Sequence, residues 1–364
     1  MRKRVEILLR KLLSESVIEK LRPIRDLIWY RDWRKESFKS FGNQNPDITF
    51  YVIRLDQSTW GRSGFFSQYF MVLRYILIAE LKGMIPIVDM ANYKTLFNED
   101  SPINGTNNSW EYYFKQPTDY ILAEVYKSKN VILTGRYPPD ENTILNKSNL
   151  EAGQERILAL SSEGYIPPSD QHIALYYELI SKFIRLNATT QALIFDRVKS
   201  ILNNKKTLGI HVRGSSFRKG ILGHPVAIEP LEYITEAKSI LSKYRFEQIF
   251  LATDEANTVK QFQDAFGNMV VCYDDITRLK SDSNFDDLCE LTIGMRDSRA
   301  KHRYLMGLEV LTDVYTLSEC HGLIAGSSNV SFAAVYINGG RYEYKHFIYK
   351  GIYGIDVPHI GGSR

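Results

Sequence analysis

The sequence predicts an α/β fold built from two Rossmann-like domains that face each other across a cleft. Three observations lead to this prediction. A strand, an apolar helix and a second strand follow one another between residues 47 and 90, and short strands and helices alternate from residue 207 to residue 337. The chain has 364 residues, 44% of them hydrophobic, which is enough for two sizeable cores.

The first of the two domains is expected to span residues 46–206. Its opening strand is rich in β-branched and aromatic residues, and the helix that follows is strongly apolar and ends at Gly83, a typical C-terminal helix cap. Because a strand, a helix and a strand in succession form a right-handed crossover, the sheet should be parallel. The expected elements are a strand at 47–56, a helix at 65–83, a strand at 84–90 and long helices within 170–203.

Residues 93–117 have no clear periodicity but contain a group of aromatic residues. Two interpretations of this group stay open. The rings are buried in the core, or they form an exposed platform on which a sugar ring stacks. The residues concerned are Trp110, Tyr112, Tyr113 and Phe114.

The second domain is expected to span residues 207–345, with 346–364 as a C-terminal tail. Pro230 falls at the first turn of a predicted helix, where proline is well tolerated. The predicted strands are 208–212, 248–254, 269–275 and 322–326, and the predicted helices are 230–244, 255–267, 302–320 and 328–337.

The first 45 residues are predicted to form a basic, amphipathic helical segment. Residues 1–40 contain 12 Lys and Arg against 6 Asp and Glu, whereas the whole chain contains 46 against 42. The rest of the chain is therefore slightly acidic, which argues against nucleic-acid binding. The segment either packs on the domain surface or lies on an anionic membrane surface.

We expect a cytoplasmic protein, placed at the inner face of the membrane if residues 1–40 bind lipid. No run of 18 apolar residues occurs, and the apolar stretch near the start is too short and too charged for a signal peptide. The three cysteines are far apart in the sequence, which is typical of free thiols in a reducing compartment. The sequence says nothing about the oligomeric state.

Polar residues follow several predicted strands of the second domain. His211 and Arg213 lie at the end of one strand, Asp254 and Asp274 at the ends of two others, and Gly326 ends a fourth. Open α/β sheets bind ligands outside the carboxyl ends of their strands. These residues are therefore expected to surround a ligand.

The two turns after these strands have the composition of a phosphate site. The planar fork of Arg213 matches two phosphate oxygens, Gly214 allows close backbone approach, and Ser215 adds a hydroxyl donor. Residues 325–329 (AGSSN) end a strand and begin a helix, whose N-terminus favours anions. We expect a pyrophosphate between these two turns.

Several other site types are excluded by the motifs that the sequence lacks. It contains no P-loop and no glycine fingerprint of dinucleotide-binding domains. It also lacks the zinc-binding patterns H-E-x-x-H and C-x-x-C. There is no nucleophile elbow and no D-x-D, the metal clamp of many sugar transferases. We expect no metal and no cofactor, and a transferase would stabilise its leaving diphosphate with arginine and helix dipoles.

Four segments resemble the fucosyltransferase superfamily of GT-B architecture: GIHVRGSSF, His224-Pro225, IFLATDE and GLIAGSSNVSFAAVYI. This superfamily includes α-1,6-, nodulation-type, α-1,2- and protein O-fucosyltransferases. The resemblance is best over residues 207–340. It implies a GT-B-like fold and a GDP-sugar donor.

The resemblance also implies residue roles. Arg213 would bind the β-phosphate of the donor, His211 and Asp313 would lie near the guanine, and Ser327 and Ser328 would match the serine turn. The first motif departs from the family pattern. Gly214 stands where the family has a second Arg, and Ser216 stands where it has an Asp, so an α-1,6 linkage is not implied.

The sequence therefore predicts an inverting, metal-independent glycosyltransferase that uses GDP-fucose to modify a surface or lipid-linked glycan. Another GDP-sugar would fit the same contacts. Inversion needs a base for the acceptor hydroxyl. Asp56, at the end of the first strand, is the first candidate and Glu229 the second. The alternative, favoured by the altered first motif, is a catalytically silent protein that binds a glycan or nucleotide.

Overall fold

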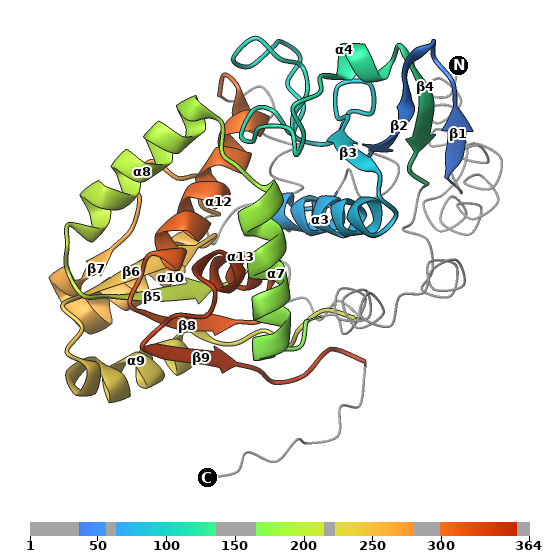
Figure 1. Ribbon diagram of the computed structural model, residues 1–364. Coiled ribbons are helices and arrows are strands. Elements are labelled where there is room, and N and C mark those ends of the chain that lie inside the picture. Colours follow the sequence, from blue (N-terminus) through green and yellow to red (C-terminus); the bar gives the residue numbers. More distant parts are fainter. Residues whose placement is uncertain (1–35, 56–62, 136–164, 215–222, 280–298, 355–364) are drawn as a thin grey trace, which may run out of the picture.

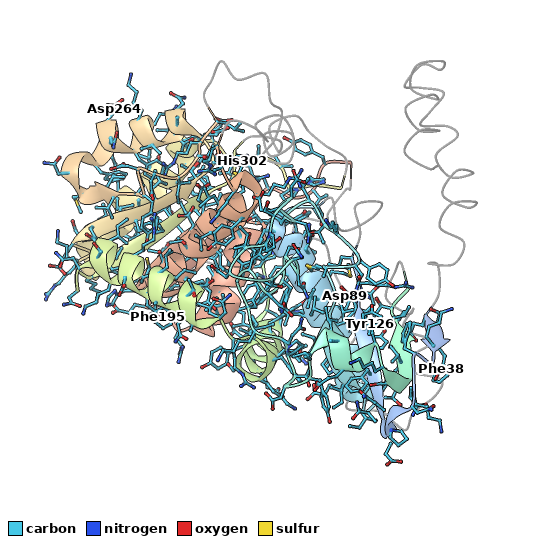
Figure 2. The ribbon with its side chains drawn as sticks, turned by 90° about the horizontal axis from the view of Figure 1, so that it is seen from above. Phe38, Asp89, Tyr126, Phe195, Asp264 and His302 are labelled. Carbon is cyan, nitrogen blue, oxygen red and sulfur yellow. The ribbon has the colours of Figure 1, made fainter. Side chains whose placement is uncertain are left out.

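The computed structural model describes residues 36–55, 63–135, 165–214, 223–279 and 299–354. Figure 1 shows two α/β units, each built around its own sheet. Seen from above, Phe38 of the first sheet and Asp264 of the second unit lie at opposite ends of the molecule (Figure 2). Three predictions fall outside the described residues: most of the basic N-terminal segment, the base Asp56 and the donor contact Ser215.

The first sheet has four strands in the order β1-β4-β2-β3. β2 pairs in parallel with β3 and β4, and β1 pairs antiparallel with β4 at the edge. The strands are β1 (Ser37–Lys39), β2 (Gln44–Ile53), β3 (Ile85–Val88) and β4 (Ser128–Leu133). The structure thus has the predicted parallel strand–helix–strand unit, extended by two further strands.

Alternating side chains of β2 bury the two faces of this sheet. Tyr51 and Ile53 pack on the side of helix α3 (Phe65–Leu81), and Phe50 and Val52 pack on the other side, near the short helix α4 (Leu122–Val125). A fully buried sheet favours such continuous apolar strands. Gly83 follows α3 with a φ of +64°, which is the left-handed conformation expected after a helix end.

Two strands of this sheet were not predicted from the sequence. β1 lies within the segment that was predicted to be helical up to residue 45, and β2 also begins inside it. The helical prediction is therefore wrong for residues 37–39 and 44–45, which are strand. β1 has only three residues, which is too short for an alternating pattern of apolar and polar residues to be recognised in the sequence. β4 has the sequence SKNVIL, three polar residues followed by three apolar ones, so it lacks the alternation that would have identified a strand.

The second sheet has five parallel strands in the order β7-β6-β5-β8-β9. Numbered along the chain, this is the order 3-2-1-4-5 of a Rossmann-like sheet, and the order reverses between β5 and β8. The strands are β5 (Thr207–Val212), β6 (Gln248–Thr253), β7 (Val270–Val271), β8 (Gly322–Gly326) and β9 (Tyr344–Ile348).

Helices cover both faces of the second sheet. Leu251 faces the cluster that contains α9 and α10, and its neighbour Phe250 faces the cluster that contains α12 and α13. Apolar residues on both faces explain why these strands were predictable as short apolar runs. The helices are α9 (Pro230–Tyr244), α10 (Ala256–Phe266), α12 (His302–Ser318) and α13 (Asn329–Asn338), and the 3₁₀ helix η4 spans Gly267–Met269.

The predicted C-terminal tail is corrected at its start. β9 occupies Tyr344–Ile348 and pairs with β8, so residues 346–348 belong to the second sheet. β9 is an edge strand whose residues are at most half-buried, and this weakens the apolar signal that would have identified it. β7 is shorter than predicted, with two residues.

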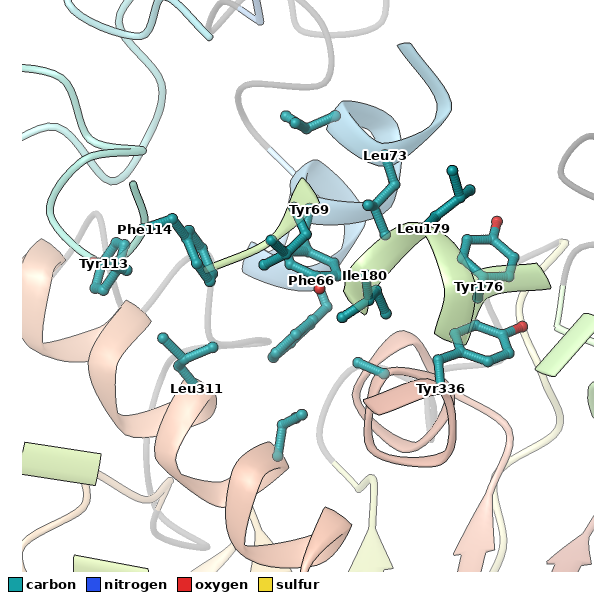
Figure 3. Packing of buried hydrophobic residues seen from close by; sticks show 14 of the residues in the cluster. Phe66, Tyr69, Leu73, Tyr113, Phe114, Tyr176, Leu179, Ile180, Leu311 and Tyr336 are labelled. Carbon is teal, nitrogen blue, oxygen red and sulfur yellow. The ribbon is translucent and has the colours of Figure 1, made fainter. Parts of the chain in front are cut away.

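One hydrophobic core connects the two sheets. It contains residues of α3, α12 and α13 together with α7 (Asp170–Phe183) and α8 (Ala188–Leu202). Figure 3 shows Tyr176 of α7 stacked on Tyr336 of α13, with ring centroids 4.2 Å apart. The two α/β units are therefore joined by packed side chains.

The aromatic group near residue 112 belongs to this core. All four rings are at most 3% exposed, so the core interpretation is correct and the sugar platform is not. The residues are Trp110, Tyr112, Tyr113 and Phe114. None of the helices in the described ranges combines the length and apolarity that a membrane span requires.

Candidate functional site

The carboxyl ends of the strands in the second sheet surround a small cavity of about 60 Å³. Parallel strands bring their carboxyl ends to one edge, and the reversal of strand order between β5 and β8 opens a crevice there. Residues from β5, β6 and α12 line the cavity, among them His211, Arg213, Thr253, Asp254, Glu309 and Asp313. The structure thus brings together four of the residues predicted to bind the donor.

Arg213 forms an ion pair with Asp254. Its Nη1 atom donates a hydrogen bond to Oδ2 of Asp254 at 2.5 Å, and the backbone N–H of Gly214 donates to Oδ1 of the same carboxylate at 3.2 Å. The Asp254 side chain is 6% exposed. The carboxylate therefore fixes the turn after β5 and offsets part of the positive charge of Arg213.

The carboxylate of Glu255 lies directly against Gly214. A Cβ atom at residue 214 would lie 2.1 Å from the carboxyl carbon of Glu255. Glu255 also accepts a hydrogen bond from Oγ1 of Thr258 at 3.0 Å in the first turn of α10. A larger residue at position 214 would displace this carboxylate, which gives a physical reason for the glycine in the altered motif.

His211 is buried and uncharged. It lies at the end of β5 with 5% of its surface exposed, and burial lowers its pKa to about 4, with a further contribution from Arg213. Its Nδ1 atom lies 3.5 Å from Oγ of Ser328. A neutral imidazole at this position can exchange hydrogen bonds with a ligand without adding charge.

Asp313 presents to the cavity a carboxylate whose Oδ1 atom lacks a partner in the described part of the chain. The residue lies on α12 and is 8% exposed, and its Oδ1 atom has no hydrogen-bond partner within the described part of the chain. Burial raises its pKa to about 7, while Arg278 acts in the opposite direction. A buried acceptor without a partner costs free energy unless a ligand or water supplies a donor.

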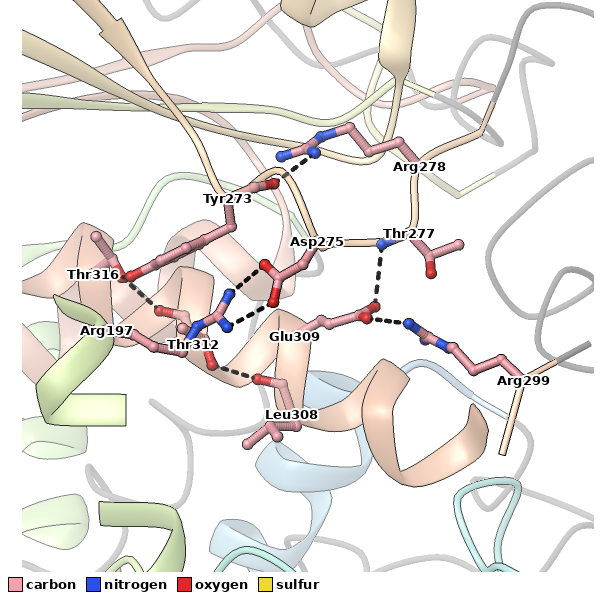
Figure 4. A network of polar contacts seen from close by, with 10 residues as sticks. All are labelled: Arg197, Tyr273, Asp275, Thr277, Arg278, Arg299, Leu308, Glu309, Thr312 and Thr316. Carbon is pink, nitrogen blue, oxygen red and sulfur yellow. Dashed lines mark hydrogen bonds and ion pairs between the residues drawn. The ribbon is translucent and has the colours of Figure 1, made fainter. Parts of the chain in front are cut away.

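A network of charged residues supports the wall of the cavity beside Asp313 (Figure 4). Arg197 donates to both carboxylate oxygens of Asp275 at 2.7 and 2.6 Å and lies over the ring of Tyr273. Glu309 accepts a bond from Arg299 at 2.6 Å. The Arg197 pair ties the segment after β7 to α8, and the backbone N–H of Thr277, which donates to Glu309 at 3.4 Å, ties the same segment to α12.

The two serines after β8 have different roles. Ser328 caps α13: its Oγ atom accepts from the backbone N–H of Ser331 at 3.2 Å. The Oγ atom of Ser327 is buried and has no hydrogen-bond partner among the residues whose positions are described. The residue before them is Gly326, and a Cβ atom there would lie only 2.4 Å from Oη of Tyr233, which favours glycine at this position.

A second, smaller cavity of about 10 Å³ adjoins the first. Arg213 lines both cavities and is the residue that they share. Besides Arg213, the polar side chains that line the second cavity are Tyr233, Ser327 and Tyr349, and its apolar wall comes mainly from residues 225–228.

The structure does not bring Glu229 into either cavity. Glu229 is exposed at the N-cap of α9, and its neighbour Ile228 lines the second cavity instead. Asp56 and Ser215 lie outside the described residues. The roles of these three residues stay predictions.

Sequence reasoning missed three residues near the cavities. Glu255 directly follows Asp254 at a strand end, a position that could have been considered. Tyr349 follows the unpredicted strand β9. Arg278 has two buried nitrogens, Nε and Nη2, without partners in the described ranges, and only the fold brings it near Asp313.

No protein-family model matches the chain, and no curated protein matches it in sequence. Among solved structures, the chain is similar to NodZ, described as an α-1,6-fucosyltransferase soaked with GDP-fucose, with a TM-score of 0.42 at 16% identity. The alignment covers 79% of this chain and 92% of that one. Another NodZ structure, from Bradyrhizobium, aligns with a TM-score of 0.40 at 16% identity, over 79% of this chain and 92% of that one.

The chain is also similar to POFUT1 in complex with GDP-fucose, with a TM-score of 0.43 at 10% identity, over 86% of this chain and 100% of that chain. A mutant of FUT1 from Arabidopsis thaliana in complex with GDP aligns with a TM-score of 0.46 at 12% identity, over 93% of this chain and 80% of that one. Both NodZ structures are described as fucosyltransferases.

Proposed function

We propose that this protein is a glycosyltransferase that binds a GDP-sugar, with GDP-fucose as the first candidate, at the carboxyl edge of its second sheet. One observation carries the proposal: Arg213 and the carboxylate of Asp313, whose Oδ1 atom has no partner in the described residues, line the same cavity at the point where the strand order reverses. A buried carboxylate and a guanidinium suit a ligand with N–H donors at one end and phosphate at the other.

The proposed base contact is specific in chemical terms. Guanine carries two adjacent N–H donors on its Watson–Crick edge, and an ionised Asp313 could accept both. Adenine presents an acceptor at the corresponding ring nitrogen, so a carboxylate favours guanine. The proposed phosphate contacts are Arg213 and the serine turn that begins α13.

The catalytic part of the proposal rests on the sequence. We propose an inverting reaction without a metal, in which Asp56 removes the proton of the acceptor hydroxyl and Glu229 is the second candidate. A surface or lipid-linked glycan is the proposed acceptor. The proposed membrane contact through residues 1–40 would place the enzyme near such an acceptor.

The donor class can be tested by thermal-shift measurements with GDP, ADP, UDP and CDP. We expect GDP to raise Tm more than the other three, since a ligand at 100 times its Kd stabilises by about 2.7 kcal/mol. The Asp313→Ala variant should lose the preference for GDP. Equal shifts for ADP and GDP in the unmodified protein would contradict the guanine assignment.

Activity can be tested by the release of GDP from GDP-fucose in excess EDTA. Arg213→Ala should abolish release, and Arg213→Lys should restore little because an ammonium lacks the planar fork. The exposed Arg341→Ala is the matched control and should behave like the unmodified protein. A strict requirement for Mg²⁺ or Mn²⁺ would contradict the metal-independent proposal, and GDP binding without any release would favour a catalytically silent binding protein.

A further inference from the structure

The small cavity beside Arg213 has room for a single atom-sized group. Its volume is about 10 Å³, which corresponds to roughly one water molecule. A sugar ring or a nucleobase could not enter it. The cavity lies between the ends of β8 and β9, and Tyr233, Ser327 and Tyr349 line it with hydroxyl groups. Tyr233 has a hydrogen bond with the backbone of Gly326, so the hydroxyls that remain to be satisfied are those of Ser327 and Tyr349.

Both hydroxyls are buried without partners. Ser327 is 4% exposed, and neither its Oγ atom nor the Oη atom of Tyr349 has a hydrogen-bond partner within the described parts of the chain. Two unsatisfied donors that line one cavity indicate a missing acceptor. An occupant of this size with acceptor capacity for both hydroxyls is a single oxygen atom.

The position of Arg213 connects this oxygen to the donor site. Arg213 lines the small cavity as well as the larger one that holds His211 and Asp313. The shared residue places the small cavity next to the larger one, within reach of a group that extends from a ligand there. Helix α13 also begins beside Ser327, and the N-terminus of a helix of 10 residues favours a negatively charged group.

The surrounding charges explain why neutral donors are needed here. Asp254 pairs with Arg213 at 2.5 Å, and the carboxylate of Glu255 packs against Gly214. These two negative charges weaken the attraction of Arg213 for an anion. Hydroxyl donors add hydrogen bonds without adding an acidic neighbour, and the Tyr349 hydroxyl stays protonated because burial raises its pKa.

We propose that this cavity is the subsite for one oxygen of the terminal phosphate of the nucleotide, with Ser327 and Tyr349 as its hydroxyl donors. The inference rests on the proposed function and adds Tyr349, a residue outside the family motifs, to the donor site. It predicts that Tyr349 distinguishes nucleoside diphosphates from monophosphates. An ordered water in the cavity is the competing explanation.

The experiment compares the Kd of GDP and GMP, measured by calorimetry, in the unmodified protein and in Tyr349→Phe and Ser327→Ala. Hydrogen bonds to a charged group suggest a loss of about tenfold to a hundredfold in GDP affinity for each variant. GMP affinity should change less than about twofold. Tyr353→Phe, on the same segment but outside the lining of the cavity, is the matched control.

Each other outcome has a distinct meaning. Unchanged GDP affinity in both variants would overturn the proposal in favour of an ordered water. Equal losses for GDP and GMP would also overturn it, because the hydroxyls would then not act on the terminal phosphate. If the unmodified protein bound neither nucleotide, the proposed function itself would fail, and this result is distinguishable from the other two.

Discussion

At the scale of single residues, burial decides the chemistry of the site. Asp313 and His211 are both largely buried, yet their pKa values move in opposite directions because burial disfavours the charged form of each. His211 is neutral at pH 7, whereas Asp313, with a pKa of about 7, is divided between its two forms. The protonation of Asp313 is therefore the pH-sensitive property of this cavity.

GDP affinity should rise with pH through neutrality. Only the ionised carboxylate of Asp313 can accept two N–H groups, and with a pKa of about 7 its ionised fraction increases about tenfold from pH 6 to pH 8. Calorimetry at these two pH values should give a Kd about tenfold lower at pH 8. Asp313→Asn should bind GDP weakly, with little dependence on pH.

The same pKa has a consequence for stability with a definite sign. The folded state holds the proton of Asp313 up to about pH 7, whereas the unfolded chain releases it near the ordinary value of 3.8. Asp313 therefore lowers the free energy of unfolding by an amount that grows as pH rises from about 4 to 7. Urea denaturation should show Asp313→Asn gaining stability over the unmodified protein at pH 8 and little at pH 4, and an equal gain at both values would contradict the buried, shifted carboxylate.

At the scale of elements, the start of α13 places a capping serine beside one whose hydroxyl has no partner within the described part of the chain. Ser328 caps the helix through its bond from Ser331, and Ser331 in turn donates to the carbonyl of Gly326 at 2.6 Å. Ser327, one residue earlier, takes no part in these bonds. The two neighbours therefore form a matched pair for mutation.

Ser328→Ala should destabilise the protein by about 1 kcal/mol because it removes an N-cap side chain. Ser327→Ala should leave stability within about 0.5 kcal/mol, since its hydroxyl has no partner to lose. Urea denaturation of the two variants measures the difference. The assignment of roles would be wrong if Ser327→Ala were the more destabilising change.

At the scale of the whole molecule, the two α/β units share one core. Tyr336 of α13 stacks on Tyr176 of α7 and meets Phe70 of α3 edge-on, with ring centroids 5.7 Å apart. The hydroxyl of Tyr113 also donates to the backbone carbonyl of Tyr304 at 2.9 Å, across the two units. Such contacts favour cooperative unfolding of both units.

Tyr336→Ala should cost about 3 kcal/mol or more, since it leaves a cavity where three helices meet. Thermal unfolding followed by circular dichroism and by tryptophan fluorescence should still give one coincident transition, at lower Tm. The control Phe195→Ala removes a ring of α8 that is 51% exposed and should change little. Two separate transitions, with only one displaced, would show that the units unfold independently.

The sequence by itself determined the elements whose signal is local. Strands such as β5 and β6 are buried on both faces, so their sequences are continuous apolar runs that predict a strand. Helix α9 begins at Pro230, as predicted. The position of His211 and Arg213 at a strand end also followed from local pattern, because parallel strands place their carboxyl ends on one edge.

Only the tertiary structure decided what depends on distant segments. The edge strands β1 and β9 are short and half-exposed, so their place in a sheet comes from pairing and not from periodicity. The ion pair of Arg213 with Asp254 joins residues 41 positions apart. The unpaired oxygen of Asp313 and the cavity between Ser327 and Tyr349 arise because packing buries these groups away from water, which the sequence of each segment cannot show.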